Sequence, residues 1–115
     1  NDNNEAYNNL TLLNMFLIKN GMEKKKFKIY DFDLDPLPVA KFDLIISLFS
    51  LDYHYDFNLY KDYLIKIFGE KTQIIFDTIR PDYFKNIFRN VKILQDNKNT
   101  VHKSKRIICS DFIIK

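Results

Sequence analysis

A short polar and aromatic cluster near the middle of the chain contains the residue types needed for acid–base chemistry. His54 has a carboxylate two positions before it and another two positions after it, Asp52 and Asp56. A histidine titrates near neutrality and can take a proton from a hydroxyl as a general base. The carboxylates could orient the imidazole or bind a metal ion. We predict His54 and Asp52 as catalytic residues, although a surface histidine among tyrosines fits the same pattern.

Candidate binding residues surround this cluster and follow a second apolar run. Tyr53 and Tyr55 offer ring faces and hydroxyls, and Arg80 offers a fork of N–H donors. Asp77 adds a polar contact. We predict these four as substrate-binding residues. Tyrosines at this spacing are also common in cores and rims, and Asp77 also fits a turn acid, so both interpretations stay open. No metal site is predicted, because the acids form no tight ligand motif.

The element that must position the cluster is the apolar run immediately before it. Residues 44–49 contain one polar side chain, Ser47, which is typical of a strand buried on both faces. In open α/β sheets, ligands bind just beyond the carboxyl ends of such strands. We therefore predict a central strand at 43–49 with a site at its end.

The rest of the chain predicts alternating helices and strands. The expected elements, in chain order, are a helix at 5–20, strands at 26–32 and 43–49, a helix at 60–68, a strand at 72–77, a short helix at 81–90, and strands at 91–96 and 101–114. Helices between strands favour right-handed crossovers and a parallel sheet. The last two strands predict an antiparallel hairpin. The predicted fold class is α/β, with mostly parallel strands, flanking helices and this terminal hairpin.

Composition limits the classes of protein that the chain can belong to. Its 115 residues suffice for one domain, and 46% hydrophobic with 29% charged residues is typical of a globular protein. A net charge of +3 is low for a nucleic-acid binder. No apolar stretch is long enough to span a membrane, and no signal peptide is visible. We expect a cytoplasmic protein with neither nucleic acid nor membrane as partner. The lone Cys109 lies between apolar residues and predicts a buried thiol.

Three motifs together resemble the class I S-adenosylmethionine-dependent methyltransferases. They are DFDLDPLPVAKFDLIISLFSLDYH at 31–54, FDTIRP at 76–81, and the terminal helix–strand–turn–strand pattern. The resemblance runs from about residue 5 to 114 and corresponds to the C-terminal part of the family's domain. The motif YHY at 53–55, which follows the strand predicted at 43–49, together with FDTIRP, resembles the bacterial sugar O-methyltransferases within that family.

The resemblance implies a cofactor, a reaction and a set of site residues. The cofactor is S-adenosylmethionine, and the reaction is methyl transfer to a hydroxyl of a small acceptor, for which a sugar is one candidate. By position, Asp33 matches the acid that binds the adenine amino group, and Phe32 and Leu34 flank the ring. Ser47 and Leu48 line the methyl-donor pocket. Asp33 also fits a loop acid that caps a turn.

The chain departs from the family at its N-terminal side. The family's Gly-rich cofactor loop is missing, since no glycine precedes Gly21, and the first residue is Asn. We expect the chain to begin inside a longer protein and to be a single incomplete methyltransferase-like domain over 1–115, with S-adenosylmethionine bound by the intact parent. Alone, it should be weak or inactive as an enzyme. The alternative is a non-enzymatic, Rossmann-like interaction or pseudoenzyme module.

The implied sheet order also predicts a structural cost. The family's order is 3-2-1-4-5-7-6, with residues 43–49 as strand 4 and 26–32 as strand 3. The two missing strands lie between them. Either these two segments pair directly, or the edge of the strand at 43–49 stays open, and an open apolar edge favours aggregation. We therefore expect a marginal folder; its oligomeric state is left open.

Overall fold

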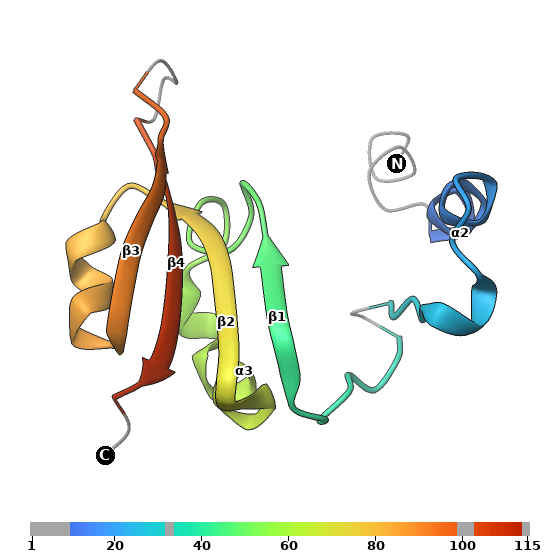
Figure 1. Ribbon diagram of the computed structural model, residues 1–115, viewed down its shortest axis with the longest axis horizontal. Helices are drawn as coiled ribbons and strands as arrows, with labels where there is room; N and C mark the ends of the chain where they lie inside the picture. The colour runs from blue at the N-terminus through green and yellow to red at the C-terminus, as the bar shows by residue number, and fades with distance from the viewer. Residues whose placement is uncertain (1–9, 32–33, 99–102, 114–115) are drawn as a thin grey trace. The chain divides into compact units, whose positions relative to one another are not determined.

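The computed structural model describes residues 10–31, 34–98 and 103–113. The chain forms two compact units, Asn1–Pro38 and Val39–Lys115. Figure 1 shows the elements of each unit. That the whole chain is one incomplete domain stays a prediction.

The first unit contains one α-helix, α2, at Leu10–Lys19. The predicted helix at 5–20 is confirmed over α2, while residues 5–9 lie outside the described part of the chain. Its end follows the sequence prediction, because Gly21 has a φ of 92°. The N–H groups of Gly21 and Met22 donate to carbonyls of the last helical turn at 3.1 and 2.9 Å. This pair of bonds is the left-handed cap that glycine favours.

The predicted strand at 26–32 is wrong. Lys24–Lys26 form a 3-10 turn, η1, and the backbone at 27–31 pairs with no strand among the described residues. Phe27 itself is extended, with φ −143° and ψ 159°. The alternation of apolar and polar side chains therefore marked extended backbone, but a strand also needs a partner for its N–H and C=O groups.

The second unit is a four-stranded sheet with short helical segments. In chain order it contains β1 (Phe42–Ser47), the 3-10 turn η2 (Phe57–Leu59), α3 (Lys61–Ile67), β2 (Phe68–Thr78), the 3-10 helix η3 (Pro81–Asn86), β3 (Phe88–Asp96) and β4 (Lys105–Phe112). The four strands predicted for this region are present with shifted ends, and the predicted helix at 60–68 is confirmed as α3. The predicted helix at 81–90 is replaced by the shorter η3 and the start of β3.

The predicted fold class, a mostly parallel Rossmann-like sheet, is wrong. The strands lie in the order β1-β2-β4-β3, and of the three pairings between neighbours only that of β1 with β2 is parallel. β4 lies between β2 and β3 and runs antiparallel to both. The prediction expected parallel pairing for all strands except the terminal hairpin, whereas β4 lies between β2 and β3 and makes two of the three pairings antiparallel. The order of the strands equals the last four positions, 4-5-7-6, of the order implied by the resemblance.

The junction between α3 and β2 has no turn. The helix ends at Ile67, and Gly69 lies in the strand that follows directly. The Thr72 hydroxyl accepts the Gly69 N–H at 2.7 Å and donates to the Phe42 carbonyl. Phe42 also pairs with Phe68 before the register shifts. These contacts extend β2 back to the end of the helix.

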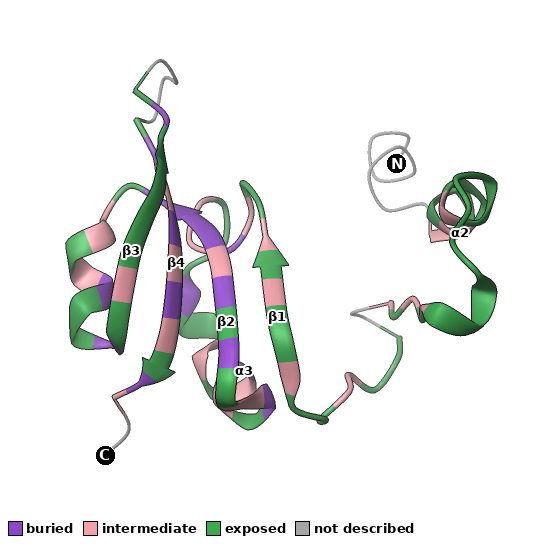
Figure 2. Ribbon diagram, in the orientation of Figure 1, coloured by how far each residue is buried: buried purple, intermediate pink, exposed green. Residues whose placement is uncertain are grey.

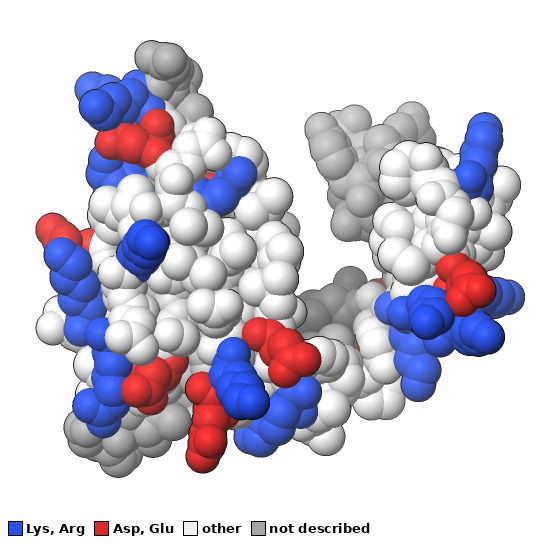
Figure 3. All heavy atoms as spheres, viewed as in Figure 1, with Lys and Arg blue, Asp and Glu red and all other residues white. Residues whose placement is uncertain are grey.

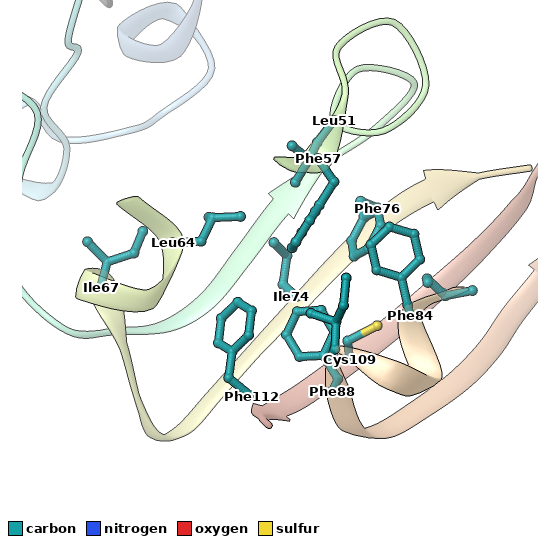
Figure 4. Packing of buried hydrophobic residues seen from close by; sticks show 12 residues of the cluster. Leu51, Phe57, Leu64, Ile67, Ile74, Phe76, Phe84, Phe88, Cys109 and Phe112 are labelled. Atoms are coloured by element: carbon teal, nitrogen blue, oxygen red, sulfur yellow. The ribbon is translucent and has the colours of Figure 1, made fainter. Parts of the chain in front are cut away.

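One face of the sheet carries the hydrophobic core. Figure 2 shows buried residues concentrated on β2 and β4, and none on α2. Ile74 and Phe76 of β2 face Phe57 of η2 and Phe84 of η3, and Cys109 of β4 lies among them (Figure 4). Phe57 stacks on Phe76 with ring centroids 5.5 Å apart, and Phe84 meets both rings edge-on. The predicted burial of the Cys109 thiol is confirmed.

The other face of the sheet, which we call the open face, is apolar but largely uncovered. Ile46, Ile75 and Ile108 lie side by side across β1, β2 and β4. Leu44 and Ile46 are 51% and 56% exposed. Figure 3 shows uncharged atoms over this region, with most charged side chains toward its margins. Among the described residues, β1 pairs only with β2, so its edge is open, as one of the two predicted outcomes for strand 43–49 requires.

Candidate functional site

The candidate site lies where β1 and β2 end together. The two strands are parallel and in register, with Ser47 opposite Phe76, so their carboxyl ends lie at the same edge of the sheet. The 48–56 loop follows β1 and carries His54. Residues 79 and 80 follow β2. That a ligand binds at the end of this strand stays a prediction.

The 48–56 loop is folded tightly on itself. The N–H groups of Tyr53, His54 and Tyr55 all donate to the Ser50 carbonyl, at 3.0, 2.8 and 3.1 Å. The Asp52 N–H donates to the Tyr55 carbonyl at 2.6 Å. Such a turn needs unusual backbone angles, and Asp52 has a φ of 58°. Aspartate tolerates this left-handed region better than most residues.

Asp52 is bound to Arg80 rather than to His54. Its side chain is 3% exposed and accepts two N–H donors from Arg80, Nη2 at 2.6 Å and Nε at 3.1 Å. The Thr78 hydroxyl donates to it at 2.7 Å and the Phe57 N–H at 3.2 Å. The hydrogen bonds that Arg80 donates to Asp52 raise the pKa of the Arg80 guanidinium. Asp52 therefore acts here as an acceptor for four donors, and the proposed orientation of the imidazole by this carboxylate is not seen.

His54 itself is exposed at the top of the turn. Its ring meets the Tyr53 ring edge-on, with centroids 4.9 Å apart. Among the residues that the structure describes, no hydrogen bond to the imidazole is present. Tyr55 is exposed as well. Both residues are therefore accessible to a ligand, as their predicted roles require.

A small pocket opens beside the imidazole. It is lined by Asp52, Tyr53, His54 and Ile79 and has a volume of about 180 Å³. Pockets that enclose a drug-sized ligand are about 300 Å³ or more. The pocket is therefore smaller than a typical site for a whole drug-sized ligand. Within the described ranges, no group of three or more His, Cys, Asp or Glu side chains could hold a metal ion.

Asp77, predicted as a substrate contact, is fully buried in a second ion pair. Arg106 donates to it through Nε at 3.0 Å and Nη2 at 3.1 Å, and the Phe49 N–H donates at 2.7 Å. The Arg106 guanidinium also lies 5.1 Å from the centre of the Phe49 ring. Phe49 has a φ of 50°, which is rare for an aromatic residue. The Asp77 pair thus holds a strained residue at the end of β1.

The residues predicted to bind the cofactor lie in both units. Phe32 and Asp33 are outside the described residues, and Leu34, 81% exposed, belongs to the first unit. Ser47 and Leu48 end β1 in the second unit. The Ser47 hydroxyl accepts the N–H of Leu51 at 3.1 Å, and Leu48 is exposed. Binding of S-adenosylmethionine by these residues stays a prediction.

Sequence reasoning missed three partners of the site: Thr78, Tyr83 and Arg106. Arg106 lies 29 residues from Asp77, and only the register between β2 and β4 brings them together. Tyr83 lies under the Arg80 guanidinium at 4.0 Å and its hydroxyl accepts from Asn58 at 2.9 Å. The sequence offered one signal for the contact between Arg80 and Tyr83, which is their spacing of three residues at the start of a predicted helix.

Comparison with known proteins gives no further guide: no protein-family model, curated protein or solved structure matches the chain. Within the described ranges, no helix is long and apolar enough to cross a membrane.

Proposed function

We propose that this chain carries the acceptor side of an S-adenosylmethionine-dependent O-methyltransferase acting on a small hydroxylated acceptor of the sugar class. The observation that carries the proposal is the meeting of the two parallel strand ends, where the 2.6 Å contact between Asp52 and Arg80 joins the loops after β1 and β2. His54 stands exposed beside the pocket at that point. Ligands of open α/β sheets bind at such an edge.

The residues of this chain would align and deprotonate the acceptor. In methyl transfer the sulfonium of S-adenosylmethionine is already a good leaving group, so alignment of the hydroxyl is the main task of the protein. His54 would take the hydroxyl proton. Tyr53 and Tyr55 would contact the sugar ring through their faces and hydroxyls. Donor binding needs residues beyond those that the structure describes, and the proposal keeps the predicted cytoplasmic location.

A methyl-transfer assay tests the proposed base. Labelled S-adenosylmethionine and a panel of neutral sugars are supplied to the 115-residue chain and to the complete polypeptide, whatever its length, that its gene encodes. We expect transfer by the complete polypeptide, and His54→Ala should lower kcat by roughly 100-fold or more, since a general base contributes about that much. The chain has two histidines, so His102→Ala, outside the described residues, is the matched control. Equal loss in both variants, or no transfer to any acceptor, would contradict the proposal.

Calorimetry tests the donor side separately. The resemblance assigns Asp33 to the adenine, so Asp33→Ala in the complete polypeptide should weaken S-adenosylmethionine binding. An unchanged affinity would remove Asp33 from the site.

A second candidate, a non-enzymatic interaction module, is favoured by one observation. Leu44 and Ile46 are more than half exposed beside the unpaired edge of β1. Large exposed apolar patches mark contact surfaces in many proteins. If the isolated chain is monomeric, unfolds cooperatively and is indifferent to S-adenosylmethionine, this second candidate is the better one.

A further inference from the structure

The position of His54 depends on how the turn at 52–56 is held. The N–H groups of 53, 54 and 55 all point to one carbonyl, that of Ser50, and the Asp52 N–H closes the turn onto Tyr55. The turn therefore behaves as one body. Its orientation relative to the sheet is set by the side chains at its two ends, Asp52 and Asp56.

Arg80 binds both of these ends. Its Nη2 lies 2.6 Å from Asp52 Oδ1 and 3.3 Å from Asp56 Oδ1, and its Nε lies 3.1 Å from Asp52 Oδ2. A bidentate guanidinium–carboxylate pair fixes direction as well as distance. Arg80 is itself anchored at the end of β2, where its own N–H donates to the Thr78 hydroxyl at 3.0 Å.

The ring of Tyr83 also contacts the Arg80 guanidinium. The central carbon of the guanidinium lies 4.0 Å from the centre of the Tyr83 ring, a stacking distance for a cation on an aromatic face. The Tyr83 hydroxyl accepts from Asn58, which follows the turn. The Nε and Nη2 groups and one face of the Arg80 guanidinium are therefore engaged by the protein itself.

We propose that Arg80 is a positioning residue, which holds the 52–56 turn against the end of β2 and so fixes where His54 stands. This differs from the sequence prediction, in which Arg80 contacts the substrate. Its catalytic consequence rests on the proposed function, whereas its effect on the turn does not. The acceptor is then bound by the tyrosines and His54, and Arg80 acts through the two carboxylates.

Amide hydrogen exchange on the full chain tests the structural part. We expect Arg80→Gln to speed exchange at Tyr53, His54 and Tyr55 by tenfold or more while the amides of β2 and β4 change by less than twofold. Arg89→Gln is the matched control, because Arg89 makes one exposed ion pair, with Asp111 at 3.4 Å. Equal acceleration in the turn and the sheet, or an unchanged turn, would overturn the proposal.

A milder variant keeps the test usable if Arg80→Gln does not fold. Asp56→Asn removes the charge from the longer arm of the network, while an asparagine can still accept the Asn58 N–H that Asp56 caps at 2.9 Å. It should therefore speed exchange at Tyr55 by about two- to fivefold. An unchanged exchange rate at Tyr55 would mean that Arg80 does not hold the turn through Asp56.

Kinetics of the complete polypeptide separate positioning from substrate contact. Positioning predicts that Arg80→Gln lowers kcat with the acceptor KM unchanged, and that Arg80→Lys recovers part of the loss. A raised KM with kcat unchanged would make Arg80 a substrate contact and overturn the proposal. If His54→Ala has no effect on transfer, the proposed function fails, but the exchange result for Arg80 still stands by itself.

Discussion

Two aspartate–arginine pairs lie at the end of β2, and they are built for different tasks. Asp77 and Thr78 are successive strand residues, so their side chains point to opposite faces of the sheet. Asp77 pairs with Arg106 on β4 and is fully buried. Thr78 donates to Asp52, whose partner Arg80 is 39% exposed. The first pair joins strands and the second joins loops.

This difference shows which pair belongs to the framework and which to the site. The Asp77 pair connects β2, β4 and the end of β1, because Asp77 also accepts the Phe49 N–H. Its removal should loosen the whole sheet. The Asp52 pair connects the turn that carries His54 to the end of β2, and water already reaches its arginine. Its removal should act mainly on the turn.

The largest effect is expected from Asp77→Asn. The change leaves the mostly buried Arg106 without its counter-charge and weakens the acceptor for Phe49. Breaking one partner of a buried pair costs about 3–5 kcal/mol, and we expect the lower end, because Arg106 is 21% exposed. Urea denaturation measures the loss, with Arg89→Gln as the surface control. A loss below about 1 kcal/mol would mean that the pair adds little to the framework.

Asp52→Asn should have a smaller effect on global stability. The asparagine keeps an oxygen for Thr78 or Phe57, while the half-exposed Arg80 can turn to water. A hydrogen bond to a charged group contributes about 1.5–3 kcal/mol, so we expect a loss of about 2 kcal/mol by the same denaturation measurement. The comparison breaks down if Asp52→Asn costs as much as Asp77→Asn.

The smallest expected effect is a pH dependence of stability that comes from a core residue, Cys109, and not from either ion pair. Burial raises the pKa of the Cys109 thiol to about 12 from its ordinary value of 9.0. Below pH 9 the thiol is protonated in both the folded and the unfolded chain, so it adds no pH dependence. Between pH 9 and 12 only the unfolded chain loses the proton, so stability falls as pH rises.

At pH 10 this thiol should lower the free energy of unfolding by roughly 1 kcal/mol relative to pH 8. Aspartate and arginine side chains keep their charges over that range. The measurement is urea denaturation at both pH values, with Cys109→Ala as control. The Cys109→Ala chain should lack this part of the pH dependence; an identical decline in both chains would remove Cys109 as its source.

Local patterns in the sequence predicted most of the elements of the second unit but not their pairing. The apolar runs that became β1 and β2, and the helical spacing that became α3, are signals carried by neighbouring residues. The place of β4 between β2 and β3 depends on pairing across dozens of residues, which no local pattern encodes. The segment at 27–31 shows the converse, since it has the alternation of a strand without a partner among the described residues.

The residues of the candidate site could be named from the sequence, but the contacts among them could not. The sequence named Asp52, Arg80 and Asp77 but gave each a separate role toward a ligand. In the structure Asp52 and Arg80 bind each other, because the two loops converge at the parallel strand ends. Asp77 binds an arginine of β4 that only the register supplies. Composition and spacing reveal which residues are polar and where a strand ends, but not which of them neutralise one another.

The single-sided pairing of β1 has a consequence for the order in which the unit assembles. β2 and β4 each have two neighbours within the sheet, whereas the edge strands β1 and β3 each have one. β1 is the shorter of the two edge strands, with 6 residues against 9 in β3. Segments with the fewest partners open first under native conditions. We therefore expect β1 to dock late in folding and to detach first. The 48–56 loop is attached to β1, so the site would exist only while the least secured strand is in place.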